Sequence, residues 1–287
     1  MKRLIFSLAI SLAVSQMPDP VKQKQFRTSD KYTAELVYDA VDHIYYVASA
    51  RTGAIGRCLP DGSYEMLYAD DNLKTTSALK MTPDGKKLFF CIGEKNEDAE
   101  PETQGKTLRL LCVDAVTGKK LSDTNLSILQ KGSHYASDLT LDSKGNIFIA
   151  DSQANVIYKV TPKGKASILV HKDQFMKQDA GISSIVWHPD GYLLIDSNGN
   201  MFKVGTNVNA KIEKVNTPKF FTATDGLVLN SKNILTIVQK EESNTIYQIE
   251  SSDNWKSASI RATLSESAQD EFTMPSKAQL TAIAYGM

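Results

Sequence analysis

The sequence predicts an all-β fold assembled from repeated four-stranded units, and three observations support this. Short runs of apolar residues, several of which alternate with polar ones, recur along the chain, as expected for buried or half-buried strands. Turn sequences rich in Gly, Asn, Asp or Pro separate these runs. The resulting unit returns at intervals of about 40 to 60 residues, which is typical of the blades of a β-propeller.

The clearest unit extends from Ser137 to Val170 and contains every part of a blade. It has a first strand around Leu139, a turn at Asp142–Asn146, a second strand ending at Asp151, and two more strands at Ile157–Val160 and Ser167–Val170. Gly and Asn tolerate the positive φ angles of the turn, so the second strand runs back beside the first. Four antiparallel strands joined in this way describe one blade.

The same order of strands and turns recurs elsewhere in the chain. Further units are predicted at Leu36–Tyr68, Ala78–Leu121, Ser184–Val215 and Asp225–Leu264, with a last inner strand at Gln279–Ala284. We therefore expect a six-bladed β-propeller of four-stranded antiparallel blades over residues 34–287, with a last blade that is incomplete or truncated. The segment Gln25–Thr33 is a candidate ring-closing strand. A two-sheet β-sandwich is the alternative, but it gives no reason for a fixed order of turn, strand, acid and hairpin.

The first 15 residues have the pattern of a signal peptide. A basic start, Met1–Arg3, precedes the apolar run Leu4–Val14, and small residues follow at the spacing that signal peptidase recognises. The run is too short to span a bilayer, which needs roughly 20 apolar residues. We expect cleavage near Ser15 and Gln16 and export to the periplasm or the medium, with residues 16–33 as a linker. A buried N-terminal helix is the alternative.

Composition excludes several classes of function. The 287-residue chain has a formal net charge of zero, so it lacks the basic footprint of a nucleic-acid-binding protein. Its three cysteines, Cys58, Cys91 and Cys112, are an odd count and predict buried free thiols, although Cys91 and Cys112 are candidates to face each other on adjacent strands. We find no nucleophile elbow, phosphate-binding glycine loop or zinc-protease motif.

Propeller geometry brings polar side chains together on one face, where first strands start and second strands end. Strand starts contribute Glu35, Ser137, Asp138, Ser183, Ser184 and Asp225, and second-strand ends contribute Ser49 or Arg51, Glu94, Asp151, Asp196 and Gln239. His134 and Tyr135, just before the third unit, add an imidazole and a phenol. Ser137, Ser184, Asp151, Asp196 and His134 are the predicted substrate-binding residues. The expected partner is a small-molecule ligand or substrate.

Five of these carboxylates on one rim, those of Glu35, Asp138, Asp151, Asp196 and Asp225, would repel one another unless a cation neutralised them. Oxygen ligands favour calcium, with magnesium or zinc as alternatives, and Glu35, Asp138 and Asp225 are the predicted metal ligands. The competing interpretation is that each Asp caps its own turn through local backbone hydrogen bonds. It applies best to Asp151 and Asp196, whereas Glu35 and Asp225 precede apolar strands and have no turn to cap.

Three segments resemble the gluconolactonase/senescence-marker-protein family, the regucalcin-like six-bladed propellers. They are AELVYDAVDHIYYVAS from Ala34, SDLTLDSKGNIFIADSQANVIYKV from Ser137 and TDGLVLNSKNILTIV from Thr224. The GNIFIAD-like phrase is shared with NHL-repeat proteins. The resemblance implies a divalent cation in the central channel, held by a Glu, two Asn and an Asp, that assists hydrolysis of a sugar lactone.

The resemblance carries over to only part of that ligand set. Glu35 and Asp225 match the family Glu and Asp, and Asp225 is the candidate general base. Ser137, and Ser183 or Ser184, stand where the two Asn are expected. Two hypotheses therefore remain: an exported, metal-assisted hydrolase of a sugar lactone or similar ester, and a non-catalytic propeller that binds a small ligand or a protein partner on the same face.

Overall fold

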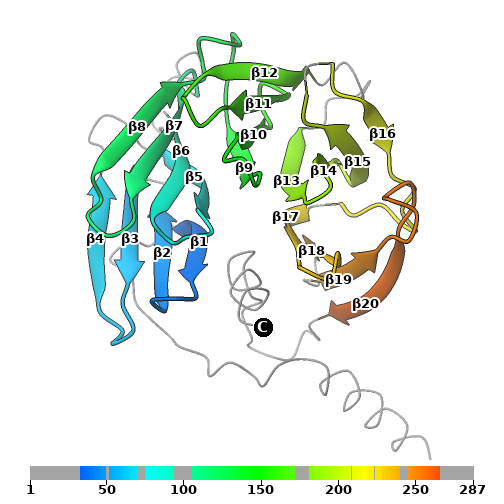
Figure 1. The fold of residues 1–287 in the computed structure, drawn as a ribbon, viewed down its shortest axis with the longest axis horizontal. Helices are drawn as coiled ribbons and strands as arrows, with labels where there is room; N and C mark the ends of the chain where they lie inside the picture. The colour runs from blue at the N-terminus through cyan, green and yellow to red at the C-terminus, as the bar shows by residue number, and fades with distance from the viewer. Residues whose placement is uncertain are drawn as a thin grey trace, which may run out of the picture.

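The computed structural model describes residues 33–49, 52–69, 75–93, 105–171, 181–207, 209–222, 224–239 and 245–265. In these residues the ordered elements are 20 strands, β1 to β20, which form five four-stranded antiparallel sheets. Figure 1 shows the sheets fanned about a common axis as the blades of a propeller. The same residues contain no helix with the length and apolar character needed to cross a membrane.

Each blade uses four consecutive strands of the chain. The first contains β1 (Thr33–Asp39), β2 (Ile44–Ser49), β3 (Ala54–Cys58) and β4 (Tyr64–Ala69). The second contains β5 (Thr75–Met81), β6 (Lys87–Gly93), β7 (Leu108–Asp114) and β8 (Lys120–Asn125). The third contains β9 (Ala136–Leu141), β10 (Ile147–Asp151), β11 (Val156–Val160) and β12 (Ala166–His171).

The fourth and fifth blades follow the same plan. The fourth contains β13 (Ile182–His188), β14 (Tyr192–Ser197), β15 (Asn200–Gly205) and β16 (Ile212–Lys214). The fifth contains β17 (Thr224–Leu229), β18 (Leu235–Gln239), β19 (Thr245–Glu250) and β20 (Ser259–Ser265). Inner strands of successive blades contact one another, β1 with β5, β5 with β9, β9 with β13, and β13 with β17. The last strand of each blade lies on the outside of the arc (Figure 1).

The prediction of six blades is wrong, because five blades form the propeller. The predicted sixth blade rested on one strand-like run, Gln279–Ala284, which lies outside the described residues. A single run does not supply the partner strands that a blade needs for its ladder of hydrogen bonds. The predicted signal peptide and residues 16–32 of the linker also lie outside the described residues. Of the candidate ring-closing strand Gln25–Thr33, only Thr33 is described, and it begins β1.

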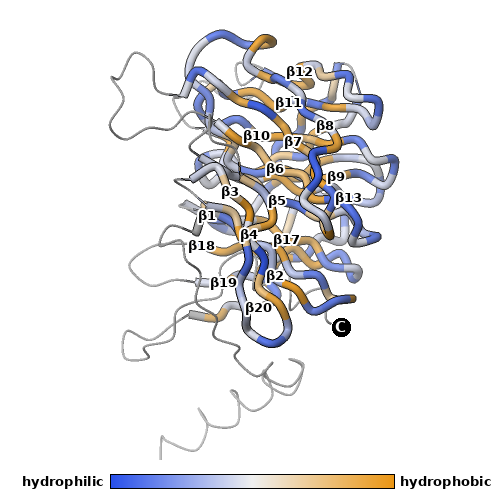
Figure 2. Tube along the Cα trace, turned by 90° about the vertical axis from the view of Figure 1, so that its left-hand side faces the viewer, coloured by the Kyte–Doolittle hydropathy of each residue, from blue (hydrophilic) through white to orange (hydrophobic). Residues whose placement is uncertain are grey.

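Apolar side chains between successive blades form the core. Four buried clusters fill the four interfaces, and the one between the second and third blades contains Cys91, Leu110, Leu139, Ile149 and Tyr158. Burying one such aliphatic side chain contributes about 1.5 to 3 kcal/mol. Figure 2 shows hydrophobic residues concentrated in the strands and hydrophilic residues in many of the turns. Most blades are therefore buried on both faces. This explains why the sequences of many of their strands are continuous runs of apolar residues.

The three cysteines are free and buried, as predicted. Cys91 pairs with Leu110 across β6 and β7, and Cys112 pairs with Phe89, so the two thiols do not face each other. Burial raises the pKa of the Cys58 and Cys112 thiols to about 11. Because the thiolate is the reactive form, all three act as small hydrophobic residues in the core.

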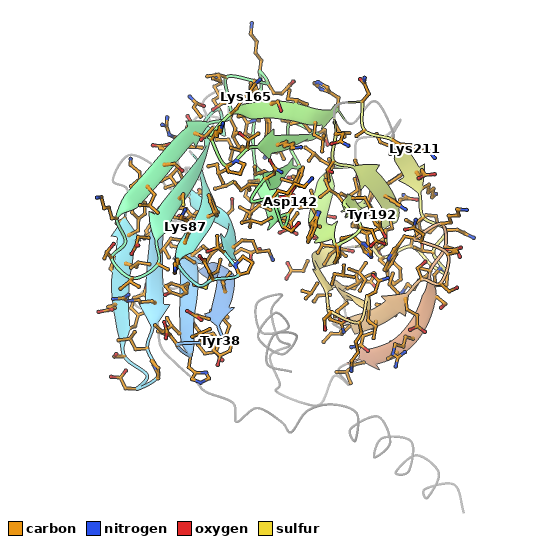
Figure 3. All side chains as sticks on the ribbon, in the orientation of Figure 1. Tyr38, Lys87, Asp142, Lys165, Tyr192 and Lys211 are labelled. Carbon is orange, nitrogen blue, oxygen red and sulfur yellow. The ribbon has the colours of Figure 1, made fainter. Side chains whose placement is uncertain are left out.

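The turn between β9 and β10 confirms the predicted hairpin. The Asp142 carboxylate accepts hydrogen bonds from the backbone N–H groups of Lys144 and Asn146, at 2.9 and 2.8 Å, and from the Asn146 side chain at 2.7 Å. Gly145 has a φ of +77°, which a residue with a side chain rarely adopts. Figure 3 shows Asp142 at the inner end of its blade and Lys165, from the β11–β12 turn, at the outer rim.

Each inner strand carries one extra residue relative to its partner strand. Near the strand start, pairing skips Ala34, Ser137, Ser183 and Asp225 in the first, third, fourth and fifth blades. In the second blade the irregularity lies further along, between Ser77 and Lys80. Such a β-bulge bends the strand and redirects side chains next to it. It therefore controls which polar side chains reach the channel.

We predict that Asp142→Ala destabilises the third blade, because three hydrogen-bond donors lose their common acceptor. The free energy of unfolding should fall by about 1 to 2 kcal/mol, measured by urea unfolding followed by circular dichroism. Lys144→Ala is the control, since the backbone of this exposed residue makes the bond and its side chain is not needed. Equal losses in the two variants would contradict the assigned role of the carboxylate.

Candidate functional site

The starts of the inner strands bring three side chains together at one mouth of the channel. Glu35 lies in β1, Asp225 lies in β17, and Tyr135 comes directly before β9. Burial raises the pKa of the Tyr135 hydroxyl, and the charges of Glu35 and Asp225 raise it further. Both carboxylates are therefore close enough to act on one phenol, although they belong to the first and fifth blades. Tyr135 remains 37% exposed and is accessible from solvent.

This mouth combines negative charge with a hydrogen-bonding hydroxyl. Two carboxylates supply acceptors, and the phenol supplies one donor and one acceptor. Their joint field disfavours another negative charge, as its effect on the pKa of Tyr135 shows. Neutral or positively charged groups that carry O–H or N–H donors fit this chemistry.

Asp138, a predicted metal ligand, lies inside the protein and joins two blades. Its side chain is buried, and its oxygens accept hydrogen bonds from the backbone N–H of Leu139, at 2.8 Å, and of Ile185 in β13, at 3.0 Å. Two residues further along each strand, Thr140 Oγ1 accepts a hydrogen bond from the backbone N–H of Trp187 at 3.1 Å. These bonds tie the inner strands of the third and fourth blades together.

The serines that stand in place of the expected Asn residues have hydrogen bonds of their own. Ser137 donates to the carbonyl oxygen of Ile182 at 2.6 Å, and Ser183 donates to the Asp196 carboxylate. Ser184 is buried, and its hydroxyl has no hydrogen-bond partner among the described residues. The hydroxyls of Ser137 and Ser183 therefore serve contacts between strands.

Asp151 ends β10 and organises the chain just before β9. Its Oδ2 lies 2.7 Å from Nδ1 of His134 and accepts a longer bond of 3.4 Å from the Tyr158 hydroxyl. Its Oδ1 accepts the backbone N–H groups of Tyr135 and Ala154 at 3.0 and 2.9 Å. The carboxylate is completely buried. It both caps its own turn, as the competing interpretation expected, and binds a histidine.

Asp196 lies in β14 in a different environment. Burial raises its pKa to about 6, although hydrogen bonds from the Ser183 hydroxyl, the Gly199 N–H and the Thr224 hydroxyl oppose that rise. Thr224 belongs to the fifth blade, so this carboxylate faces the interface between the fourth and fifth blades. A titratable acid is thus buried between two inner strands.

Asp151 and Asp196 do not occupy equivalent positions, although both end a second strand in the sequence pattern. Asp151 pairs with Ala136, the residue before the bulge, whereas Asp196 pairs with Ser184, the residue after it. Successive residues of a strand point to opposite faces of the sheet. Asp151 therefore points towards the second blade and Asp196 towards the fifth. The predicted roles of both residues in substrate binding stay predictions.

Several other predicted rim residues serve local contacts. Ser49 Oγ accepts the N–H of Thr52 at 3.1 Å, and Gln239 donates to the Thr222 hydroxyl at 3.1 Å. Arg51 and Glu94 lie outside the described residues.

Sequence reasoning missed two groups of residues near the mouth. Lys219 donates to the Tyr247 hydroxyl at 2.8 Å and lies over its ring, 4.5 Å from the centroid, which places a cation in the fifth blade. Thr75 and Ser77 line a small cavity between the second and third blades. The predicted second unit began at Ala78, so the hydroxyl-rich TTS sequence before it was not recognised as the start of an inner strand.

The predicted divalent cation remains a prediction. Among the described residues, no group of three or more His, Cys, Asp or Glu side chains is arranged to hold a metal ion. Because backbone N–H groups occupy the oxygens of Asp138, a cation at the mouth would depend on Glu35 and Asp225, with other ligands supplied by water or by a bound molecule.

No family model matches the sequence, and no curated protein matches it. Solved structures do resemble the fold. A streptogramin B lyase is 14% identical, with a TM-score of 0.60 over 86% of this chain and 73% of that one. A catalytically inactive virginiamycin B lyase from Staphylococcus aureus, with quinupristin, is 16% identical, with a TM-score of 0.60 over 89% and 77%.

A protein assigned to the gluconolactonase family is 11% identical, with a TM-score of 0.55 over 81% of this chain and 79% of that one. At these identities the comparisons establish a propeller fold and leave the activity open. They include the family that the sequence resembles, together with a second group of enzymes that the sequence did not indicate.

We predict that Asp196 makes stability depend on pH. Its pKa is near 6 in the folded protein and near 3.8 in the unfolded chain, so the folded state binds the proton more tightly. The free energy of unfolding should therefore fall as pH rises from about 4 to about 6 and level off above about 7, by on the order of 2 to 3 kcal/mol. Urea unfolding across this range should show a flatter profile for Asp196→Asn than for the wild type.

We also predict that Asp138→Asn destabilises the propeller without affecting the mouth. An amide NH₂ cannot accept a hydrogen bond, so one of two buried N–H groups loses its acceptor at a cost of about 1 to 3 kcal/mol. Asp123→Asn, which breaks the partly exposed pair with Arg109, should cost less than about 1 kcal/mol. Similar losses in both variants, measured by urea unfolding, would contradict the assignment of Asp138 to the interface.

Proposed function

We propose that this propeller binds a small ligand rich in O–H or N–H donors, neutral or positively charged, at the channel mouth formed by Glu35, Tyr135 and Asp225. The proposal is carried by the position of these residues at the starts of inner strands, with Tyr135 exposed to solvent. The effect of both carboxylates on the pKa of the Tyr135 hydroxyl supports it. Three separate blades supply these groups, so their convergence follows from the arrangement of the inner strands across all five blades. The phenol is partly exposed and offers a ring face and a hydroxyl to a ligand.

Charge decides which ligands fit this mouth. Carboxylates accept hydrogen bonds from sugar hydroxyls and pair with ammonium groups, and a hydrogen bond to a charged group is worth about 1.5 to 3 kcal/mol. An anionic ligand would instead add a third negative charge. We therefore expect discrimination between ligands of the same shape and different charge.

Metal-assisted hydrolysis of a sugar lactone is the second candidate function. The fold likeness to a gluconolactonase-family protein and the retained pair of Glu35 and Asp225 favour it. The engagement of Ser137, Ser183 and Asp138 in contacts between strands weighs against it, because these groups stand at or near the places of the remaining ligands. We therefore place ligand binding first.

A matched ligand series tests the proposal. Glucose, glucosamine and glucuronate share a pyranose ring and are neutral, cationic and anionic near neutral pH, so isothermal titration should show binding of the first two and none of glucuronate. Glu35→Gln/Asp225→Asn should weaken glucosamine binding about tenfold or more, since at least one charged hydrogen bond worth 1.4 kcal/mol or more is lost. Asp123→Asn is the surface control.

Equal binding of glucuronate and glucosamine, or unchanged binding in the double variant, would exclude this mouth as the site. A second arm measures hydrolysis of glucono-δ-lactone above its spontaneous rate, with and without added calcium or zinc. Metal-dependent turnover that disappears in the double variant would establish the second candidate instead.

A further inference from the structure

Next to the mouth, a cavity of about 20 Å³ lies between the second and third blades. In the second blade its lining comes from the start of β5, the end of β6 and the start of β7, and in the third blade from the start of β9 and the chain just before it. The lining includes Thr75, Ser77, Thr107, His134 and Tyr135. A single water molecule needs a cavity with roughly 10 to 15 Å³ open to the centre of a water-sized sphere, together with two or more polar partners. The cavity therefore has room for one water-sized group.

One ring nitrogen of His134 has a defined partner and the other has none. Nδ1 lies 2.7 Å from the Asp151 carboxylate, which can only accept, so the proton belongs on Nδ1. The Nε2 atom is buried and has no hydrogen-bond partner among the described residues. In the neutral ring that atom is an acceptor, and leaving a buried acceptor unpaired costs about 1 to 3 kcal/mol.

We propose that the cavity binds one O–H donor, a water molecule in the ligand-free protein, which donates a hydrogen bond to Nε2 of His134. His134 lines the cavity whereas Asp151, which binds Nδ1, does not, so we infer that Nε2 is the ring nitrogen nearer the cavity. Thr75, Ser77 and Thr107, which carry hydroxyl groups, also line it. Asp151 acts as a positioning residue that fixes the tautomer.

The proposed water site lies next to the channel mouth, so its chemistry bears on a ligand bound there. A water held against the lone pair of a carboxylate-oriented imidazole is poised for general-base chemistry. Tyr135 lines this cavity and also stands at the mouth with Glu35 and Asp225. A ligand seated at the mouth would thus lie beside the water. That consequence rests on the proposed function, whereas the water site does not.

The test uses ligand-free protein and therefore has an outcome separate from the ligand titrations. Oxygen-17 magnetic relaxation dispersion counts long-lived internal waters. His134→Asn keeps a donor towards Asp151 and removes the Nε2 acceptor, so it should lose one such water. His188→Asn makes the same change at the opposite end of an inner strand, where the ring bonds to Asn233, and should lose none from this cavity.

A second measurement on the wild type guards against a misfolded variant. Nitrogen-15 imidazole spectra, with His134 assigned from its missing signals in His134→Asn, should show a protonated Nδ1 and an unprotonated Nε2. In Asp151→Asn the two nitrogens should lose this strict preference, which a purely space-filling role of Asp151 would not cause. An unchanged water count in His134→Asn, or a protonated Nε2 in the wild type, would overturn the proposal.

Discussion

An extra residue in each inner strand controls where the polar side chains of this propeller point. Because the side-chain period of a strand is two, one inserted residue moves every later side chain to the other face. In four blades the insertion lies at the channel mouth, where pairing skips a residue and the next residue resumes the ladder. Asp225 is itself the inserted residue of its blade, whereas Glu35 and Asp138 each follow one. Similar positions in the sequence thus have different surroundings in space.

The turns and many of the strands could be predicted from the sequence, because they depend on local conformational preferences. The Asp142–Asn146 hairpin and the strand that ends at Asp151 lie where the pattern placed them, because Gly, Asn and Asp have strong conformational preferences. The five units also follow the predicted order, although the second begins at Thr75 and not at Ala78. The number of blades and the registers depend on pairing between distant segments, to which a run of apolar residues contributes little information. Thus Asp151 and Asp196 looked equivalent in sequence, yet one residue of register places them on opposite faces.

The acids of this face fall into three electrostatic classes. Asp138 and Asp151 are buried, and each accepts at least two backbone N–H groups, which compensate the carboxylate for lost water. The hydrogen bonds to Asp196 stabilise its charged form less than burial destabilises it, so the pKa of Asp196 is raised. Glu35 and Asp225 remain near solvent and act together on Tyr135. Among the described acids of this face, only Glu35 and Asp225 combine charge with access to solvent, and we therefore propose the ligand site there.

One carboxylate connects the mouth to the protein interior. The two oxygens of Asp151 bind successive residues, because Oδ2 holds the His134 ring and Oδ1 holds the backbone N–H of Tyr135. The side chains of these two residues diverge, the imidazole into the interface between the second and third blades and the phenol towards solvent. A displacement of the Asp151 carboxylate would therefore move both the imidazole of His134 and the backbone that carries the Tyr135 phenol. The proposed water site and the proposed ligand site thus share one carboxylate as their common support.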